Sequence, residues 1–202
     1  MKKFITFISR QAENALKAQN YQAVDNQLLA YDKQTRFPII PILHGYTEPE
    51  EPVRVIAVCE TYDNSRRNLE YLKQELTAVQ TEQNLKLDLK VLEVPYDDGI
   101  DAQLETFQKL IDEIEDDDLL FACVTYGGKP SPIVLTMALR YACFARRNTA
   151  IRCVAYGQLD HETREAKIFD VTALLQTDDI LRLLAESGVA DVRSSIKRIL
   201  SL

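Results

Sequence analysis

One segment of the chain reads LLFACVTYGGKPSP, from Leu119 to Pro132. Its first half is a short apolar run, which is typical of a buried strand in the middle of a sheet. Two glycines follow, and then come Ser131 and Pro132, residue types suited to the N-cap and the first position of a helix. The segment therefore predicts a central strand, a tight turn and a helix, which together form one unit of an α/β protein.

The same alternation of patterns continues on both sides of this segment. Short apolar or alternating runs predict strands at residues 3–8, 53–59 and 85–91. Apolar residues at helical spacing predict helices over residues 64–79, 104–114 and 131–144. The strand at 85–91 alternates strictly, so one of its faces is polar and we expect it near an edge of the sheet. The helix at 131–144 is apolar on nearly every side, so we expect it to be deeply buried.

The C-terminal part of the chain departs from this alternation. Residues 151–156 and 166–171 flank a polar turn, which predicts an antiparallel hairpin at a sheet edge. Two short helices should follow, one that starts at Thr177 and ends near Gly188, and one over residues 192–199.

Residues 10–52 are harder to interpret. Residues 21–30 fit either a strand or a helix, and four prolines argue against regular structure after them, at Pro38, Pro41, Pro49 and Pro52. The readable patterns nevertheless predict an α/β fold: a Rossmann-like open sheet, mostly parallel with a C-terminal antiparallel hairpin, and helices on both faces. The length of 202 residues fits a single domain over residues 1–202.

The composition is that of an ordinary globular chain, with 46% hydrophobic and 27% charged residues. The 31 acidic residues outnumber the 24 lysines and arginines, so the formal net charge is -7. Long nucleic acids are usually bound by a dominant basic field, so this balance argues against such a partner but allows a small anionic ligand. No apolar run reaches the roughly 18–20 residues of a membrane span, and no signal peptide is recognisable. We therefore expect a cytoplasmic protein that binds no membrane.

The residue types that usually hold metals are few and scattered. Four cysteines lie inside apolar stretches, without a CxxC pair or a nearby histidine, at Cys59, Cys123, Cys143 and Cys153. This pattern is typical of small core residues in a reducing compartment. The acidic run at 115–118 is more typical of a solvated loop than of a metal site. We expect no metal and no cofactor.

The strongest candidate for a binding site is the loop after the central strand, because ligands of open α/β sheets bind beyond the carboxyl ends of the strands. Gly127 and Gly128 let backbone N–H groups approach a ligand, and the following helix start adds unsatisfied donors. Lys129 adds a full charge. The hydroxyl groups in the loop belong to Thr125, Tyr126 and Ser131. These features predict a phosphate cradle, or alternatively a tight turn in which Ser131 only caps the helix; neither GxxxxGK[ST] nor GxGxxG is present.

Three further loops, after Ile8, Cys59 and Val94, should reach the same edge of the sheet. After the strand at 53–59 come Thr61, Tyr62 and Asn64, whose hydroxyl and amide groups suit contacts with a base or a ribose. An N-cap and a solvated first helical turn explain these residues equally well. Ser9 and Arg10 follow the first strand and should complete the wall of the site.

The order of these features resembles the CARF domain, the CRISPR-associated Rossmann fold, from about residue 3 to residue 184. The resemblance rests on four segments, Lys3–Ile8, Val58–Thr61, Val124–Pro132 and Ala166–Thr172. The third segment is similar to the family's strand-end motif of a threonine, a glycine, a basic residue and a proline before a helix. Two features depart from the family pattern: Ser9–Ala12 replaces a glycine-rich turn, and Tyr126 stands at the aromatic or histidine position of the motif.

The resemblance implies a homodimer in which the strand-end loops of both copies form one symmetric pocket for a cyclic oligoadenylate. This ring of 3′–5′ linked adenylates is the second messenger of type III CRISPR immunity, and the tetra-adenylate is the expected member. Residues 3–184 would form the CARF-like core and residues 185–202 a C-terminal helix. The RxxxxH motif of the family's ribonuclease effectors is absent, so the resemblance implies a member without an effector domain.

Some effector-free members are ring nucleases, which degrade the messenger and damp the signal. The resemblance implies metal-independent attack of a ribose 2′-OH on the adjacent phosphorus, with Lys129, Tyr126 and Ser131 as the catalytic residues. The implied ligand-binding residues are Ser9, Arg10, Thr61, Tyr62, Asn64, Thr125, Gly127 and Gly128. Two alternatives stay open: a non-catalytic sensor that signals to a separate effector protein, and an α/β nucleotide- or phosphate-binding enzyme outside this family.

Overall fold

The computed structural model of the chain describes residues 1–160 and 162–200. They form two compact units, Met1–Asp170 and a helical segment that begins at Val171. The first unit contains the sheet, and the second consists of α5 (Thr172–Glu186) and α6 (Val192–Leu200). The second unit starts its helix at Thr172, which is five residues earlier than the Thr177 start that the sequence predicted, because an extended apolar stretch precedes the expected cap.

The first unit is built on a seven-stranded sheet in the order β2-β7-β6-β5-β1-β3-β4. Its strands are β1 Lys2–Phe7, β2 Tyr21–Ala23, β3 Pro52–Glu60, β4 Lys86–Val94, β5 Leu119–Cys123, β6 Ala150–Leu159 and β7 Ala166–Asp170. All neighbouring strands pair in parallel except β6 and β7, which form the antiparallel hairpin. The predicted fold, a mostly parallel Rossmann-like open sheet with a C-terminal hairpin, is confirmed.

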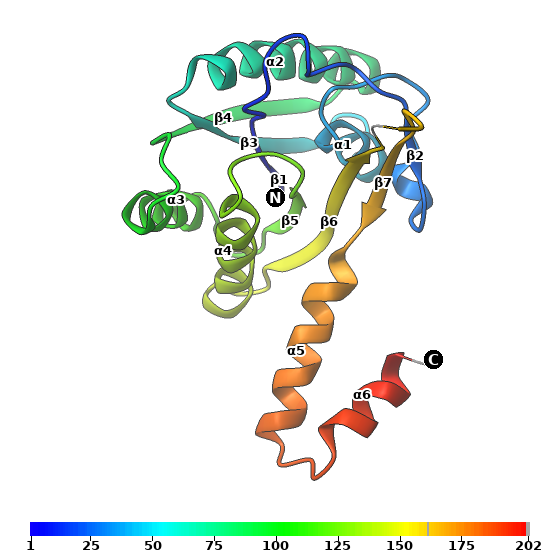
Figure 1. Cartoon of the computed structure of the whole chain (residues 1–202), viewed down its shortest axis with the longest axis vertical. Helices are drawn as coiled ribbons and strands as arrows, with labels where there is room; N and C mark the ends of the chain where they lie inside the picture. Colours follow the sequence, from blue (N-terminus) through cyan, green and yellow to red (C-terminus); the bar gives the residue numbers. More distant parts are fainter. Residues whose placement is uncertain (161, 201–202) are drawn as a thin grey trace. The chain divides into compact units, whose positions relative to one another are not determined.

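Helices cover both faces of this sheet. Figure 1 shows α1 and α2 over one face, and α3 and α4 over the other. Their bounds are α1 Ile39–Tyr46, α2 Asp63–Gln83, α3 Ile100–Asp112 and α4 Ser131–Ala145, and a short 3-10 helix, η1, spans Gln27–Leu29. The main core lies under α1 and α2, where Phe4 of β1 and Phe121 of β5 stack with their ring centroids 4.6 Å apart. Among the described residues, no helix combines the length and apolar character that a membrane span requires.

The prediction that prolines limit regular structure after residue 30 was wrong for α1. Pro38 is the N-cap of this helix and Pro41 lies in its first turn, where backbone N–H groups have no partner inside the helix. Apolar contact then decides the structure, because Ile39, Ile40 and Leu43 are at most 1% exposed. Pro52 is likewise tolerated, because it is the first residue of β3.

The sequence predicted one edge of the sheet correctly and the other wrongly. As expected, β4 is an edge strand, and β5 is central. The hairpin was expected at the other edge, but β2 pairs in parallel with β7 and covers it. The segment that fitted either a strand or a helix therefore contains both β2 and η1, because a three-residue strand is set by its partner rather than by its own pattern.

The deep burial predicted for α4 is also wrong. Val134, Leu135 and Ala138 face the sheet and are at most 6% exposed, whereas Ile133 and Phe144 are 63% and 64% exposed. A helix on the outside of a sheet can cover only one of its own faces, however apolar the other face is. The helix also begins one residue earlier than expected, because Pro130 rather than Ser131 is its N-cap, and Pro130 makes no side-chain cap bond.

Candidate functional site

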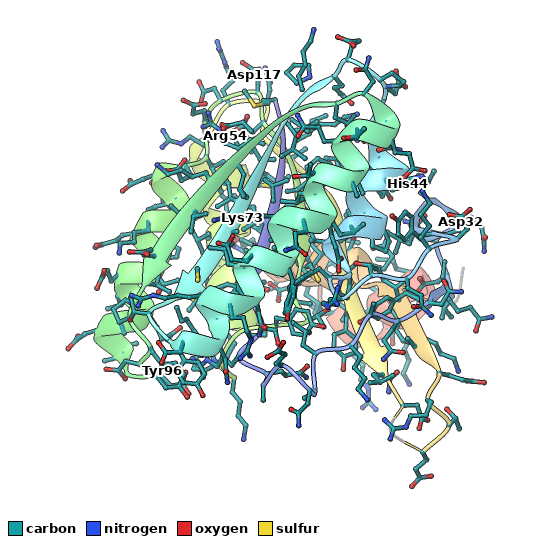
Figure 2. The ribbon with its side chains drawn as sticks, turned by 90° about the horizontal axis from the view of Figure 1, so that it is seen from above. Asp32, His44, Arg54, Lys73, Tyr96 and Asp117 are labelled. Carbon is teal, nitrogen blue, oxygen red and sulfur yellow. The ribbon has the colours of Figure 1, made fainter. Side chains whose placement is uncertain are left out.

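The loops singled out by the sequence meet at one edge of the sheet. Strands β5, β1, β3 and β4 are adjacent and parallel, so the loops that follow them lie side by side. Figure 2 shows Tyr96, which follows β4, at the opposite end of the strands from Arg54 and Asp117. This is the edge at which open α/β sheets bind their ligands.

Arg10, in the loop after β1, is the centre of an ionic cluster at this edge. Its guanidinium contacts Glu60, the last residue of β3, through Nε and also through NH2, the latter at 2.6 Å from Oε1. The same NH2 group lies 2.8 Å from Oδ1 of Asp98 in the loop after β4. These hydrogen bonds, that to Glu60 first, raise the pKa of Arg10, and Arg10 in turn lowers the pKa of Asp98. Two carboxylates therefore balance the charge of the predicted cation.

An aromatic stack supports this cluster. The Arg10 guanidinium lies 4.8 Å from the centre of the Tyr96 ring, and Tyr96 stacks on Tyr62 with a centroid separation of 4.4 Å. Asn64 donates from Nδ2 to the backbone oxygen of Arg10 at 3.2 Å and to the Tyr62 hydroxyl at 3.1 Å. Tyr62 and Asn64 thus stabilise the loop that carries Arg10, and their side-chain polar groups already form hydrogen bonds within the protein.

The glycine turn after β5 packs directly against the ionic cluster. Gly127 has a backbone φ of +104°, which residues other than glycine rarely adopt, and a Cβ there would lie 2.6 Å from the Ser131 side chain. A Cβ on Gly128 would lie 2.4 Å from Oδ1 of Asp98 and 2.5 Å from NH2 of Arg10. The carboxylate of Asp98 therefore stands against the backbone of Gly128, at the place where the sequence predicted a bound phosphate.

The other residues of the predicted cradle differ in their access to a ligand. The Thr125 hydroxyl accepts the N–H of Gly157 at 2.8 Å, which ties the end of β5 to β6. The Tyr126 hydroxyl donates to the backbone oxygen of Arg36 at 2.7 Å, and burial raises its pKa well above the usual value. Ser131 is only 1% exposed. Lys129 is exposed and forms no hydrogen bond or ion pair with the part of the chain that the structure describes.

Ser9 and Thr61 complete the set of predicted ligand-binding residues. Ser9 is 1% exposed, and its hydroxyl accepts the N–H of Gln11 at 3.1 Å. Asn68 on α2 donates to the backbone oxygens of Ser9 and Gln11, both at 2.9 Å, so this loop is firmly held. Thr61 is exposed, and its backbone N–H donates to the carbonyl oxygen of Val94. This hydrogen bond joins the ends of β3 and β4.

Three residues of the site were not predicted: Asn68, Tyr96 and Asp98. The signal for Asp98 and Tyr96 was weak, because the sequence of residues 95–99, Pro-Tyr-Asp-Asp-Gly, is that of an ordinary turn. The charges offered a signal that could have found these contacts. A cation after one strand and acidic residues at the ends of two others must come close once the strands are parallel neighbours.

Two hollows flank the glycine turn. One, of about 250 Å³, is lined by Arg10, Tyr96, Asp97 and Asp98. The other, of about 290 Å³, is lined mainly by polar side chains and backbone, among them Gln11, Lys17, Gln19, Thr125, Tyr156 and Gln158. The second is close to the lower end of the roughly 300–1,000 Å³ range of small-molecule sites. A hollow of about 730 Å³ lies elsewhere, between residues 20–32 and His44 of α1.

No family model matches the chain, and no match was found among curated proteins. Among the described residues, no group of three or more histidine, cysteine, aspartate or glutamate side chains is arranged to hold a metal ion. The site offers one exposed lysine, an arginine paired with two carboxylates, and backbone amides beside a polar hollow.

Proposed function

We propose that this chain binds a cyclic oligoadenylate, with the tetra-adenylate as the expected ring, between two copies of itself and opens the ring. It would act in the cytoplasm and damp type III CRISPR signalling. The observation that carries the proposal is the junction of the loops after β5, β1, β3 and β4. There Gly127, Gly128 and the exposed Lys129 directly follow Thr125 and Tyr126, which line a polar hollow of about 290 Å³. The CARF-like order of the sequence motifs supports the same ligand.

The proposed reaction needs no cofactor. The ribose 2′ oxygen bonds to the adjacent phosphorus, and the bond from that phosphorus to the 5′ oxygen breaks. The 2′ hydroxyl loses its proton and the leaving 5′ oxygen gains one, so the product is a linear chain ending in a 2′,3′-cyclic phosphate. The role of the protein is to align the attacking and leaving oxygens and to stabilise charge on the phosphate, a role that we assign to the Lys129 ammonium and the amides of Gly127 and Gly128.

A non-catalytic sensor is the second candidate, and a specific observation favours it. Of the three residues expected to be catalytic, Tyr126 donates its hydroxyl to Arg36 and Ser131 is 1% exposed. Only Lys129 then faces solvent, and a single ammonium group suits binding as well as it suits catalysis. A sensor would return the ring intact, whereas a ring nuclease returns linear fragments.

The deciding experiment incubates the full chain with cyclic tri-, tetra- and hexa-adenylate in the presence of a metal chelator and measures the products by mass spectrometry. A linear product ending in a 2′,3′-cyclic phosphate is expected, and it would identify the ring size. An intact ring that raises the melting temperature of the protein would establish the sensor instead. Neither effect with any of the three rings would reject both candidates.

Lys129→Ala tests the residue on which the mechanism depends. We expect a single-turnover rate about 100-fold lower, as for other enzymes that lose one donor to the charged transition state. Lys86→Ala is the matched control, because Lys86 is an exposed lysine at the amino end of β4, paired with Glu50. Unchanged turnover in Lys129→Ala would remove the cradle from the mechanism.

A further inference from the structure

The exposed face of α4 carries a row of large apolar side chains. Ile133, Met137, Tyr141 and Phe144 are spaced by four, four and three residues, so they lie along one side of the helix, here named the α4 stripe. They are 63%, 49%, 42% and 64% exposed. A helix face that served only to meet water would carry polar residues at these positions.

The neighbouring helix α3 extends the stripe into a groove. Figure 1 shows α3 and α4 side by side on the same face of the sheet. Ile100 and Leu104 of α3 are 71% and 47% exposed, and the Phe107 ring meets Tyr141 edge to face at 5.9 Å. The groove between the helices has a volume of about 300 Å³ and an almost wholly apolar lining.

The exposed apolar area is concentrated here. Six of the eleven exposed large hydrophobic side chains described in the first unit lie on α3 and α4. At roughly 100 Å² each, they present about 600 Å², the upper limit of the largest patch on an ordinary monomer. A standard interface buries about 800 Å² per partner, so this patch with its polar rim is of the size that a stable dimer needs.

We propose that the α3–α4 face is the surface through which two copies of this chain associate. The face is self-complementary, because it places a ridge, the α4 stripe, beside a groove, and a two-fold axis sets the ridge of each copy into the groove of the other. Its rim carries both signs of charge: Asp101 and Glu105 are acidic, and Lys109 pairs with Glu105 at 2.7 Å. A rim of one sign would repel an identical copy, whereas this one does not.

This interface would border the candidate ligand site. Asp98 and Pro130 line the groove at one end, and both belong to the loops that form the site. The inference deepens the proposed function, which requires two copies, by naming the face that joins them. Its evidence is independent of the ligand, because it consists only of the exposed apolar side chains and their arrangement.

The test is the molar mass of the full chain in solution, measured by light scattering over a dilution series. The wild type is expected at about twice its 23.1 kDa. Ile133→Glu and Met137→Glu each place a charge in the interface and should weaken the dimer about 100-fold or more. Because both side chains are exposed, circular dichroism and the melting curve should still show a folded chain. Leu28→Glu is the matched control: Leu28 is 51% exposed on η1, away from this face, and its variant should stay dimeric.

Either of two results would overturn the inference. A wild type that is monomeric at about 50 µM protein would show that no second copy covers this face. A dimer that survives both glutamate substitutions would place the contact on another surface. The outcome is separable from the proposed function: a dimer that neither binds nor opens the adenylate rings contradicts the function alone, and a ring-opening dimer that survives both glutamate substitutions contradicts the interface alone.

Discussion

The guanidinium of Arg10 is shared between a buried and an exposed carboxylate. Glu60 has a side chain 4% exposed, whereas that of Asp98 is 53% exposed. A phosphate bound as proposed would use the same donors and the same place beside Gly128, so it would displace the more loosely held Asp98. We expect Asp98→Asn to bind pyrophosphate and cyclic tetra-adenylate about 10-fold more tightly than the wild type, as measured by calorimetry.

A matched control separates this contact from the overall charge. Asp101→Asn makes the same charge change at an exposed position in the first turn of α3, and Asp101 has no ion pair with Arg10. Its affinity for both anions should stay within about 2-fold of the wild type, because exposed charges are strongly screened. Equal tightening in both variants would mean that Asp98 acts only through its charge and does not occupy the site.

Tyr126 makes the stability of the protein sensitive to alkaline pH. Burial raises its pKa, so the folded chain keeps the phenol proton where the unfolded chain begins to lose it, above pH of about 10. Stability should therefore be complete below that pH and fall as the pH rises further. Tyr126→Phe should reduce this slope in urea unfolding between pH 9 and 11, while costing about 1 kcal/mol at pH 8 through the lost bond to Arg36.

Other buried groups also make stability depend on pH in this range, but they do not affect the comparison of the wild type with Tyr126→Phe. Burial raises the pKa of Tyr21 to about 12 and that of Cys59 to about 11. Both remain in the Tyr126→Phe variant, so only the difference between the two slopes reports on Tyr126. Identical slopes would show that this hydroxyl titrates as freely in the folded chain as in the unfolded one.

At the scale of the elements, the contact between α1 and η1 depends on the absence of one side chain. A Cβ on Gly45 of α1 would lie 1.6 Å from the backbone oxygen of Leu28 in η1. Because that oxygen belongs to the backbone, the two elements would have to move apart. We expect Gly45→Ala to lower the free energy of unfolding by about 3 kcal/mol in urea titrations. Gln27→Ala, at an exposed position of the same η1, should stay within about 0.5 kcal/mol of the wild type.

The elements that the sequence predicts best are those whose pattern and packing agree. Strands β3 and β5 are apolar runs between turn residues, and both lie inside the sheet. Helix α1 was missed because its prolines suggested a break, although the first turn tolerates them. The burial of α4 was overestimated because an apolar residue looks the same in a sequence whether it is buried in the core or exposed on the surface.

The candidate site was predictable in place but not in its internal contacts. The alternation of strands and helices was enough to predict that the loop around Gly128 lies at the carboxyl edge of the sheet, beside the loops after β1 and β3. The pairing of Arg10 with Glu60 and Asp98 depends on the relative positions of three strands, which no local pattern contains. Nor could the sequence show that the hydroxyl of Tyr126 is used inside the fold rather than at the site.

For the molecule as a whole, a net charge of -7 is compatible with an anionic ligand only if recognition is local. The Debye length is about 8 Å at physiological salt, so most of the acidic surface is screened from the site. What an anion meets at short range is Lys129 and, once Asp98 is displaced, Arg10. Overall charge therefore argues against a long nucleic acid and does not decide on a small one.

The two units should also differ in how firmly they are folded. In the second unit, Thr172 is the one buried residue described in α5, and Leu174 and Leu183 are 70% and 62% exposed. Helices with so little buried apolar area open at low free-energy cost, whereas β1 and β5 lie between two layers of helices. Hydrogen exchange should therefore show amides of α5 and α6 exchanging at least about 100-fold faster than those of β1 and β5. Equal protection in all four elements would mean that the exposed leucines of α5 are covered in solution, and dilution of the protein would then show whether the cover is a second copy of the chain.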